Sequence, residues 1–136
     1  MIENRVLDLS VDSKIAFAYV LKFQDVSVDP QGNTTTTDID ITGATFKSSI
    51  KDSLDDDGRL ITDIDIRVAT PNAGIATMTI TKDKVDILEK AAVKDREKYN
   101  PRIRFVGYYD VIMTMPNKTP IRILEGKVYI NDGVTG

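Results

Sequence analysis

Aspartates are the side chains in this sequence with the best prospect of chemistry, because the chain of 136 residues contains no Cys and no His. His is the side chain that most readily transfers protons near neutral pH, and Cys is the readiest thiol nucleophile. Any catalysis would therefore depend on carboxylates, Lys, Ser, Thr or Tyr. The lack of Cys also excludes disulfide bonds and thiolate metal sites.

Four aspartates, Asp52 and Asp55-Asp56-Asp57, gather in one short segment and raise the question of a calcium site. An EF-hand loop needs Gly at its sixth position, oxygen ligands at the first, third and fifth, and a bidentate acid at the twelfth. When Gly58 takes the sixth position, the twelfth is Ile64, which cannot bind calcium. A solvated hairpin turn is favoured over a weak metal site. The sequence therefore predicts no metal and no cofactor.

Two carboxylate pairs have a spacing that could suit acid–base catalysis: Asp38 with Asp40, and Asp63 with Asp65. Residues two apart on a strand point to the same face, and like charges placed there can raise a pKa. Each pair is nevertheless the polar half of a regular apolar–polar alternation, and this favours a solvated face. We expect no catalytic residue and no enzymatic activity.

The dipeptide Tyr108-Tyr109 offers a different kind of site, because an exposed tyrosine ring can stack on a sugar or lie at a protein interface. Neighbouring residues of a strand point to opposite faces. One of the two rings must therefore face the core, and at most one is available to a ligand. Structural packing of both rings is the competing interpretation.

Apolar and polar residues alternate in short runs along the whole chain, which is the pattern of half-buried strands. The clearest run is 60–68, where Leu60, Ile64, Ile66 and Val68 share one face. About eight such runs, separated by turn signals about every ten residues, predict an all-β antiparallel sandwich.

The last two runs, 104–115 and 121–130, are expected to form a hairpin-like pair. The apolar positions change parity within the second run. A β-bulge near Glu125-Gly126 would explain this change, since Gly readily takes the bulge conformation.

One short α-helix is predicted over residues 82–99. Val85, Leu88, Ala92 and Tyr99 fall on one helical stripe, and Thr81 is a candidate N-cap whose hydroxyl could accept from a free backbone amide. Asn100-Pro101 is expected to end the helix, because the residue before Pro avoids the α region.

Bulk composition excludes several classes of protein. The net charge of −3 argues against a nucleic-acid-binding face, and no run approaches the ~20 apolar residues that span a membrane. With 41% hydrophobic and 29% charged residues the chain is expected to be globular. We predict an N-terminal arm or added hairpin over residues 1–35 and a β-sandwich over residues 36–136.

The run from Ile15 to Phe23 is the most apolar in the chain and must be covered on both faces. Two coverings are open: a partner protein, or the sandwich of the same chain. If a partner covers it, the predicted interface residues are those of this run together with one tyrosine: Ile15, Phe17, Tyr19, Leu21, Phe23 and Tyr108.

From Ile39 onward the order of these signals resembles a known family, the immunoglobulin-like structural modules of tailed-bacteriophage tails. The resemblance is carried by the following segments: Thr42-Gly43-Ala44-Thr45-Phe46, the acidic turn with Gly58, 60–68, Gly74-Ile75-Ala76-Thr77-Met78-Thr79-Ile80-Thr81, Tyr109-Asp110-Val111, Arg122-Ile123-Leu124-Glu125-Gly126-Lys127-Val128 and Gly133-Val134-Thr135. These are strand and turn patterns, and they carry no catalytic residues onto this chain.

The resemblance implies an immunoglobulin-like β-sandwich that acts as a non-enzymatic structural subunit in the collar, baseplate or fibre-attachment region of a phage tail. Its partners would be other tail proteins and copies of itself in a homo-oligomer, with no nucleic acid and no membrane insertion. It would be made in the host cytoplasm and reside in the virion tail. The alternative is a glycan- or receptor-binding module of the same fold.

Overall fold

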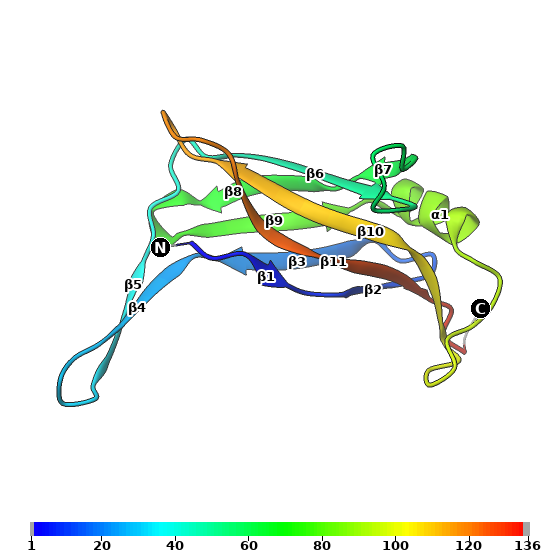
Figure 1. Cartoon of the computed structure of the whole chain (residues 1–136), viewed down its shortest axis with the longest axis horizontal. Coiled ribbons are helices and arrows are strands. Elements are labelled where there is room, and N and C mark those ends of the chain that lie inside the picture. Colours follow the sequence, from blue (N-terminus) through cyan, green and yellow to red (C-terminus); the bar gives the residue numbers. More distant parts are fainter. Residues whose placement is uncertain (1, 135–136) are drawn as a thin grey trace.

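The structure, a computed structural model, describes residues 2–134 and contains one α-helix and a series of β-strands (Figure 1). The helix α1 spans Lys82–Ala91, and a short 3-10 turn spans Pro71–Ala73. The strands, in chain order, are β1 (Arg5–Val6), β2 (Leu9–Asp12), β3 (Phe17–Lys22), β4 (Gln24–Val28), β5 (Thr34–Asp38), β6 (Thr45–Lys51), β7 (Leu60–Asp63), β8 (Asp65–Thr70), β9 (Ile75–Ile80), β10 (Ile103–Thr114) and β11 (Ile121–Asn131).

Two sheets face each other around a single core (Figure 1). The larger sheet has the order β1-β11-β10-β6-β7, with β2 also paired to β11, and the smaller has the order β3-β9-β8. This confirms the predicted β-sandwich with one helix. The largest fully buried side chains of the core are Val11, Ile41, Ile50, Met78, Ile80, Val85, Leu88, Val111, Met113, Val128 and Ile130.

Strands within residues 1–35, for which an N-terminal arm or added hairpin was predicted, contribute to both sheets and to a separate hairpin. β1 and β2 join the larger sheet through β11, β3 joins the smaller sheet through β9, and β4 pairs with β5 in a hairpin that projects from the body. β1 and β2 run parallel to β11, whereas the prediction was antiparallel throughout. More than a hundred residues separate these strands in sequence, so no tight turn forces them to be antiparallel.

The chain passes from the larger sheet to the smaller at Ile64, between β7 and β8. The sequence predicted one continuous strand over 60–68, because the alternation of apolar residues runs through the crossing. Ile64 is 4% exposed, and its backbone N–H donates to the Ser48 carbonyl at 3.1 Å. Leu60, predicted to face inward, is 56% exposed, because an irregular register between β6 and β7 turns Ile61 toward the core instead.

β10 and β11 form the predicted pair, but the bulge in β11 lies at Ile123 and the prediction near Gly126 was wrong. Val111 pairs with Leu124 and Ile112 with Arg122, so Ile123 is the additional residue. Two neighbouring apolar side chains, Ile123 and Leu124, are consequently both buried. The parity change seen in the sequence comes from this site. Met1 and Thr135 of the predicted segments lie outside the described residues.

α1 is shorter than the predicted helix of residues 82–99. It buries Val85 and Leu88 and ends at Ala91, after which Ala92 has extended backbone angles. The backbone N–H groups of Val93 and Glu97 donate instead to carbonyls of β10, at 2.9 and 3.0 Å. Thr81 precedes the helix, but its hydroxyl makes no capping hydrogen bond. Within residues 2–134 no helix has the length and apolar character to cross a membrane.

A charged clamp holds the segment after α1 against the end of β11. The Arg104 guanidinium donates two hydrogen bonds of 2.8 Å to the Asp132 carboxylate, and Arg96 donates one of 2.9 Å. Arg104 and Asp132 are both largely buried at this site. The hydrogen bonds from Arg104 lower the pKa of Asp132. The clamp thus ties the segment after α1 and the start of β10 to the residue that follows β11.

Truncating Ile64 tests the crossing. We expect Ile64→Ala to lower the free energy of unfolding by about 2–5 kcal/mol, because a buried side chain is lost from the seam between the sheets. Leu60→Ala is the control and should change it by about 0.5 kcal/mol or less. Urea denaturation of both variants measures the two values, and equal losses would contradict the crossing at Ile64.

Removing the Asp132 charge tests the clamp. Asp132→Asn should lower the free energy of unfolding at neutral pH by about 1–3 kcal/mol. A lowered native pKa contributes stability above the unfolded pKa of about 3.9, and this is lost as the pH falls through the native value. The gap between wild type and variant should therefore close in acid. A gap in denaturation free energy that is the same at pH 7 and pH 2.5 would refute the clamp.

Candidate binding surfaces

The six predicted interface residues do not form one patch. Phe17, Leu21 and Phe23 pack against the core of their own chain. Ile15, which precedes β3, and Tyr19, which lies within β3, are exposed, and Tyr108 is half-buried on the outer face of the larger sheet. Intramolecular covering, the second of the two alternatives, therefore accounts for the three inward residues. Phe17 and Leu21 lie opposite Ile80 and Ala76, both buried, whereas Tyr19, which lies on the same face opposite buried Met78, is still 42% exposed.

The free edge of β3 is the first surface available to a partner. Among residues 2–134, β3 pairs with β9 on one side and has no strand on the other. A groove of about 520 Å³ runs beside this edge, between β3 and β1. Apolar Val20 and Leu21 and basic Arg5 and Lys22 line part of it. An unpaired strand edge with apolar neighbours is a ready template for pairing with another chain.

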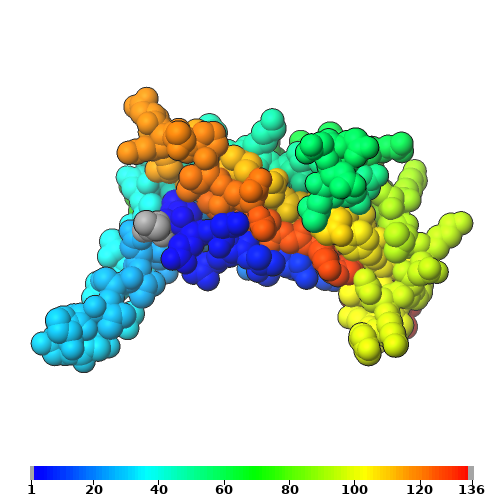
Figure 2. Space-filling model, in the orientation of Figure 1, coloured from blue at the N-terminus to red at the C-terminus, as the bar shows by residue number. Residues whose placement is uncertain are grey.

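The hairpin β4–β5 is the second surface, and sequence reasoning did not identify it as a site. All residues of both strands are exposed, and the hairpin stands clear of the body (Figures 1 and 2). Val26 and Val28 lie two apart on the same face and are 64% and 66% exposed. The alternation of valine with polar residues over 24–28 was the available signal, but it is too short to distinguish an exposed strand from a buried one.

Local hydrogen bonds order the hairpin at both ends. At its tip, the backbone N–H groups of Gln31 and Asn33 donate to the Asp29 carboxylate, and the bond from Asn33 lowers the pKa of Asp29. At its base, the backbone N–H of Phe23 donates to the Gly74 carbonyl at 2.8 Å, and the backbone N–H of Ile39 donates to the Phe23 carbonyl at 3.0 Å. Gly74 has φ +68°, and a Cβ there would overlap the carbonyl oxygens of Phe23 and Ile39. The hairpin is thus anchored in one orientation.

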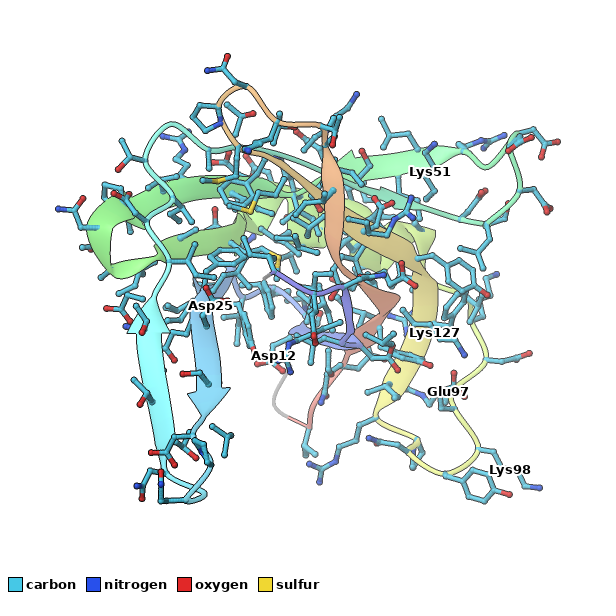
Figure 3. All side chains as sticks on the ribbon, turned by 60° about the vertical axis from the view of Figure 1, so that its left-hand side comes forward. Asp12, Asp25, Lys51, Glu97, Lys98 and Lys127 are labelled. Carbon is cyan, nitrogen blue, oxygen red and sulfur yellow. The ribbon has the colours of Figure 1, made fainter. Side chains whose placement is uncertain are left out.

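The third surface is a polar groove of about 600 Å³ on the outer face of the larger sheet. Its floor comes from the middle strands β6, β10 and β11, and the acidic turn at 52–58 borders it. Tyr108 lies in this groove, paired across the sheet with Lys51 on one side and Lys127 on the other. Figure 3 labels the two lysines.

Of the tyrosine pair, Tyr109 faces inward, as predicted for one of the two. It is buried, and its hydroxyl donates to the Leu7 carbonyl at 2.6 Å. Burial raises the pKa of the Tyr109 phenol. Gly126, opposite Tyr109 on β11, comes so close to Leu7 that a Cβ would overlap the Leu7 carbonyl oxygen. This close approach is the structural role of Gly126.

The acidic residues are engaged in turns and ion pairs. Asp52 accepts from the backbone N–H of Arg59 at 2.8 Å, which closes the turn that the sequence predicted. Asp63 pairs with Lys84 at 2.9 Å, and Asp65 pairs with Arg67 at 3.1 Å. In the part of the chain that the structure describes, no three carboxylates come together in a group that could hold a metal ion.

These surfaces define a β-sandwich module that presents a strand edge, a projecting hairpin and a polar groove. Residues 3–131 match the family described as LtfC-like, beta-sandwich domain. The chain therefore belongs to the LtfC-like beta-sandwich family, which is a phage-related family. No curated protein matches the chain.

A substitution at Gly126 tests the close approach of the N-terminal segment. Gly126→Val should lower the free energy of unfolding by at least about 1–3 kcal/mol, because the new side chain displaces Leu7 and strains the Tyr109 hydrogen bond. Lys127→Val, at the neighbouring exposed position, is the control and should change it by about 0.5 kcal/mol or less. Thermal and urea unfolding measure both. A neutral Gly126→Val would show that the segment around Leu7 does not lie there.

Proposed function

We propose that this chain is a non-enzymatic structural subunit of a phage tail, in the collar, baseplate or fibre-attachment region. It acts by assembling with copies of itself and with other tail proteins, and it resides in the virion after synthesis in the host cytoplasm. Membership of a phage-related β-sandwich family supports this role. The observation that carries the proposal is the exposed hairpin β4–β5.

The body of its own chain covers neither strand of the hairpin and so contributes little to the stability of β4 and β5. A two-stranded hairpin alone is at best marginally stable in water, and it usually needs a third strand or a packed face. β4 and β5 have neither among the described residues. Burying Val26 and Val28 against a neighbour would contribute about 1.5 kcal/mol or more for each side chain. A partner subunit supplies what the hairpin lacks.

The open edge of β3 offers a second contact of the same kind. Its backbone groups can pair with a strand of a neighbouring chain, and Val20 is exposed beside them. Lys22 stands at the end of the strand, where its charge limits indiscriminate pairing. The hairpin of one subunit could therefore bind the open β3 edge of the next in a head-to-tail contact. Repeated contacts of this kind form a closed ring when the rotation between successive subunits adds up to a full turn.

The state of the carboxylates supports a non-enzymatic role. General acid catalysis near neutral pH needs a carboxyl group whose pKa is raised. In this chain hydrogen-bond donors lower the pKa of several carboxylates, and the donor with the largest effect is Gln24 for Asp38, Thr42 for Asp40 and Lys84 for Asp63. These groups stay ionised at neutral pH and serve to hold loops and strands in place.

Charging the apolar face of the hairpin tests the proposal. The double variant Val26→Asp, Val28→Asp should leave the melting temperature nearly unchanged, because both sites are exposed, and should abolish incorporation into tails. The assay complements a phage that lacks this gene with each variant, and then counts intact tails by electron microscopy.

The control is Ser27→Asp with Thr35→Asp, which adds the same charge to the opposite face of the same hairpin. Tails should form normally with this control. Normal tails with the valine variant would remove the hairpin from the interface, and normal tails without the protein would refute the structural role altogether.

A further inference from the structure

The polar groove on the outer face of the larger sheet shares no lining residue with the hairpin and only Val6 with the groove beside the edge of β3, and the proposed tail assembly gives it no role. Its volume of about 600 Å³ is in the range of small-molecule sites. Its floor consists of strands that already have neighbours on both sides, since β10 pairs with β11 along most of its length and with β6 from Tyr108 to Thr114. The backbone groups of the floor are therefore not available to pair with a peptide.

Tyr108 provides a flat apolar surface in this groove. Its ring meets Phe105 edge-on, with centroids 5.2 Å apart, and Phe105 in turn meets Tyr129 at 5.8 Å. These contacts hold the Tyr108 ring in one orientation before any ligand arrives. The ring points away from the core, because neighbouring residues of a strand point to opposite faces and Tyr109 points inward.

Polar side chains that are held by ion pairs lie beside Tyr108, two residues further along β10 and its neighbouring strands. Asp110 lies two residues after Tyr108 on the same face of β10, and its cross-strand partners are Ser49 and Glu125. The neighbouring cross-strand row contains Lys51, Tyr108 and Lys127. Arg122 joins the two acids, at 3.1 Å from Asp110 and 3.7 Å from Glu125. All three side chains are partly exposed, so their remaining donors and acceptors face solvent. Carboxylates and guanidinium held in this way present acceptors and donors side by side.

The charges in the groove disfavour an anionic ligand. The acids lining it, Asp8, Asp55, Asp56, Asp110 and Glu125, outnumber the bases Lys51, Lys127 and Arg122. A phosphate or an acidic sugar would meet a net negative surface. A ligand rich in hydroxyl groups can donate to the carboxylates, accept from the cations and lay the apolar face of a pyranose ring on Tyr108.

We propose that this groove binds a neutral glycan, with one pyranose ring stacked on Tyr108 and its hydroxyl groups bonded to Asp110, Glu125 and Lys127. Such a site would let a tail subunit hold a surface polysaccharide while its hairpin and strand edge remain engaged in assembly. Glycan binding and assembly are thus independent properties of two different surfaces.

The test is an NMR titration of the full chain with three neutral trisaccharides: maltotriose, cellotriose and N,N′,N″-triacetylchitotriose. We expect saturable shifts of the Tyr108, Asp110 and Lys127 amide signals with at least one sugar, at a Kd of about 1 mM. Tyr108→Ala should weaken binding about tenfold or more, and Tyr108→Phe, which keeps the ring, should restore it. Tyr99→Ala is the matched control, because Tyr99 is 91% exposed and does not line the groove.

Three results would overturn the proposal. In the first, the amide signals of the groove residues do not shift with any of the three sugars at roughly tens of millimolar, and the protein binds no glycan on an array of neutral glycans. Another is binding that Tyr108→Ala leaves unchanged. In the third, the amide signals of the groove residues shift with a short peptide and with no sugar.

Discussion

The pairing of β10 on both of its sides is the constraint on which the rest of this structure depends. β6 and β11 hold β10 in register, so each of its residues points either into the core or outward. Tyr109, Val111 and Met113 fill the core. The same register forces Tyr108 and Asp110 onto the outer face, where they meet side chains of both neighbours. The groove is therefore a consequence of how the core is packed.

Much of this could be predicted from the sequence, because residues two apart on a strand share a face. The pair β10–β11, the sandwich and the opposite directions of Tyr108 and Tyr109 all follow from that rule. The crossing at Ile64 could not be predicted, since the alternation continues unchanged through the change of sheet. Glycine is the usual signal of a bulge and predicts one near Glu125-Gly126, whereas buried Ile123 carries the bulge and Gly126 makes room for Leu7.

Where the structure differs from the sequence prediction, interactions between residues distant in sequence determine the structure. The stripe of residues 82–99 looks helical locally, but beyond Ala91 the backbone bonds to β10, and Asp132 binds Arg96 and Arg104. For the apolar run around β3 the sequence left two coverings open, a partner protein or the sandwich of the same chain, and much of the run covers its own core. The candidate surfaces that remain are those that the chain cannot cover by itself: the hairpin, the edge of β3 and the polar groove.

The central claim is that the hairpin β4–β5 is completed by a neighbouring subunit. Amide hydrogen exchange, followed by mass spectrometry in the free protein and in purified tails, tests this most directly. Residues 24–38 should exchange rapidly in the free chain and slowly in the tail, while β10 and β11 are protected in both. Equal protection of residues 24–38 in the two states, whether high or low, would contradict it.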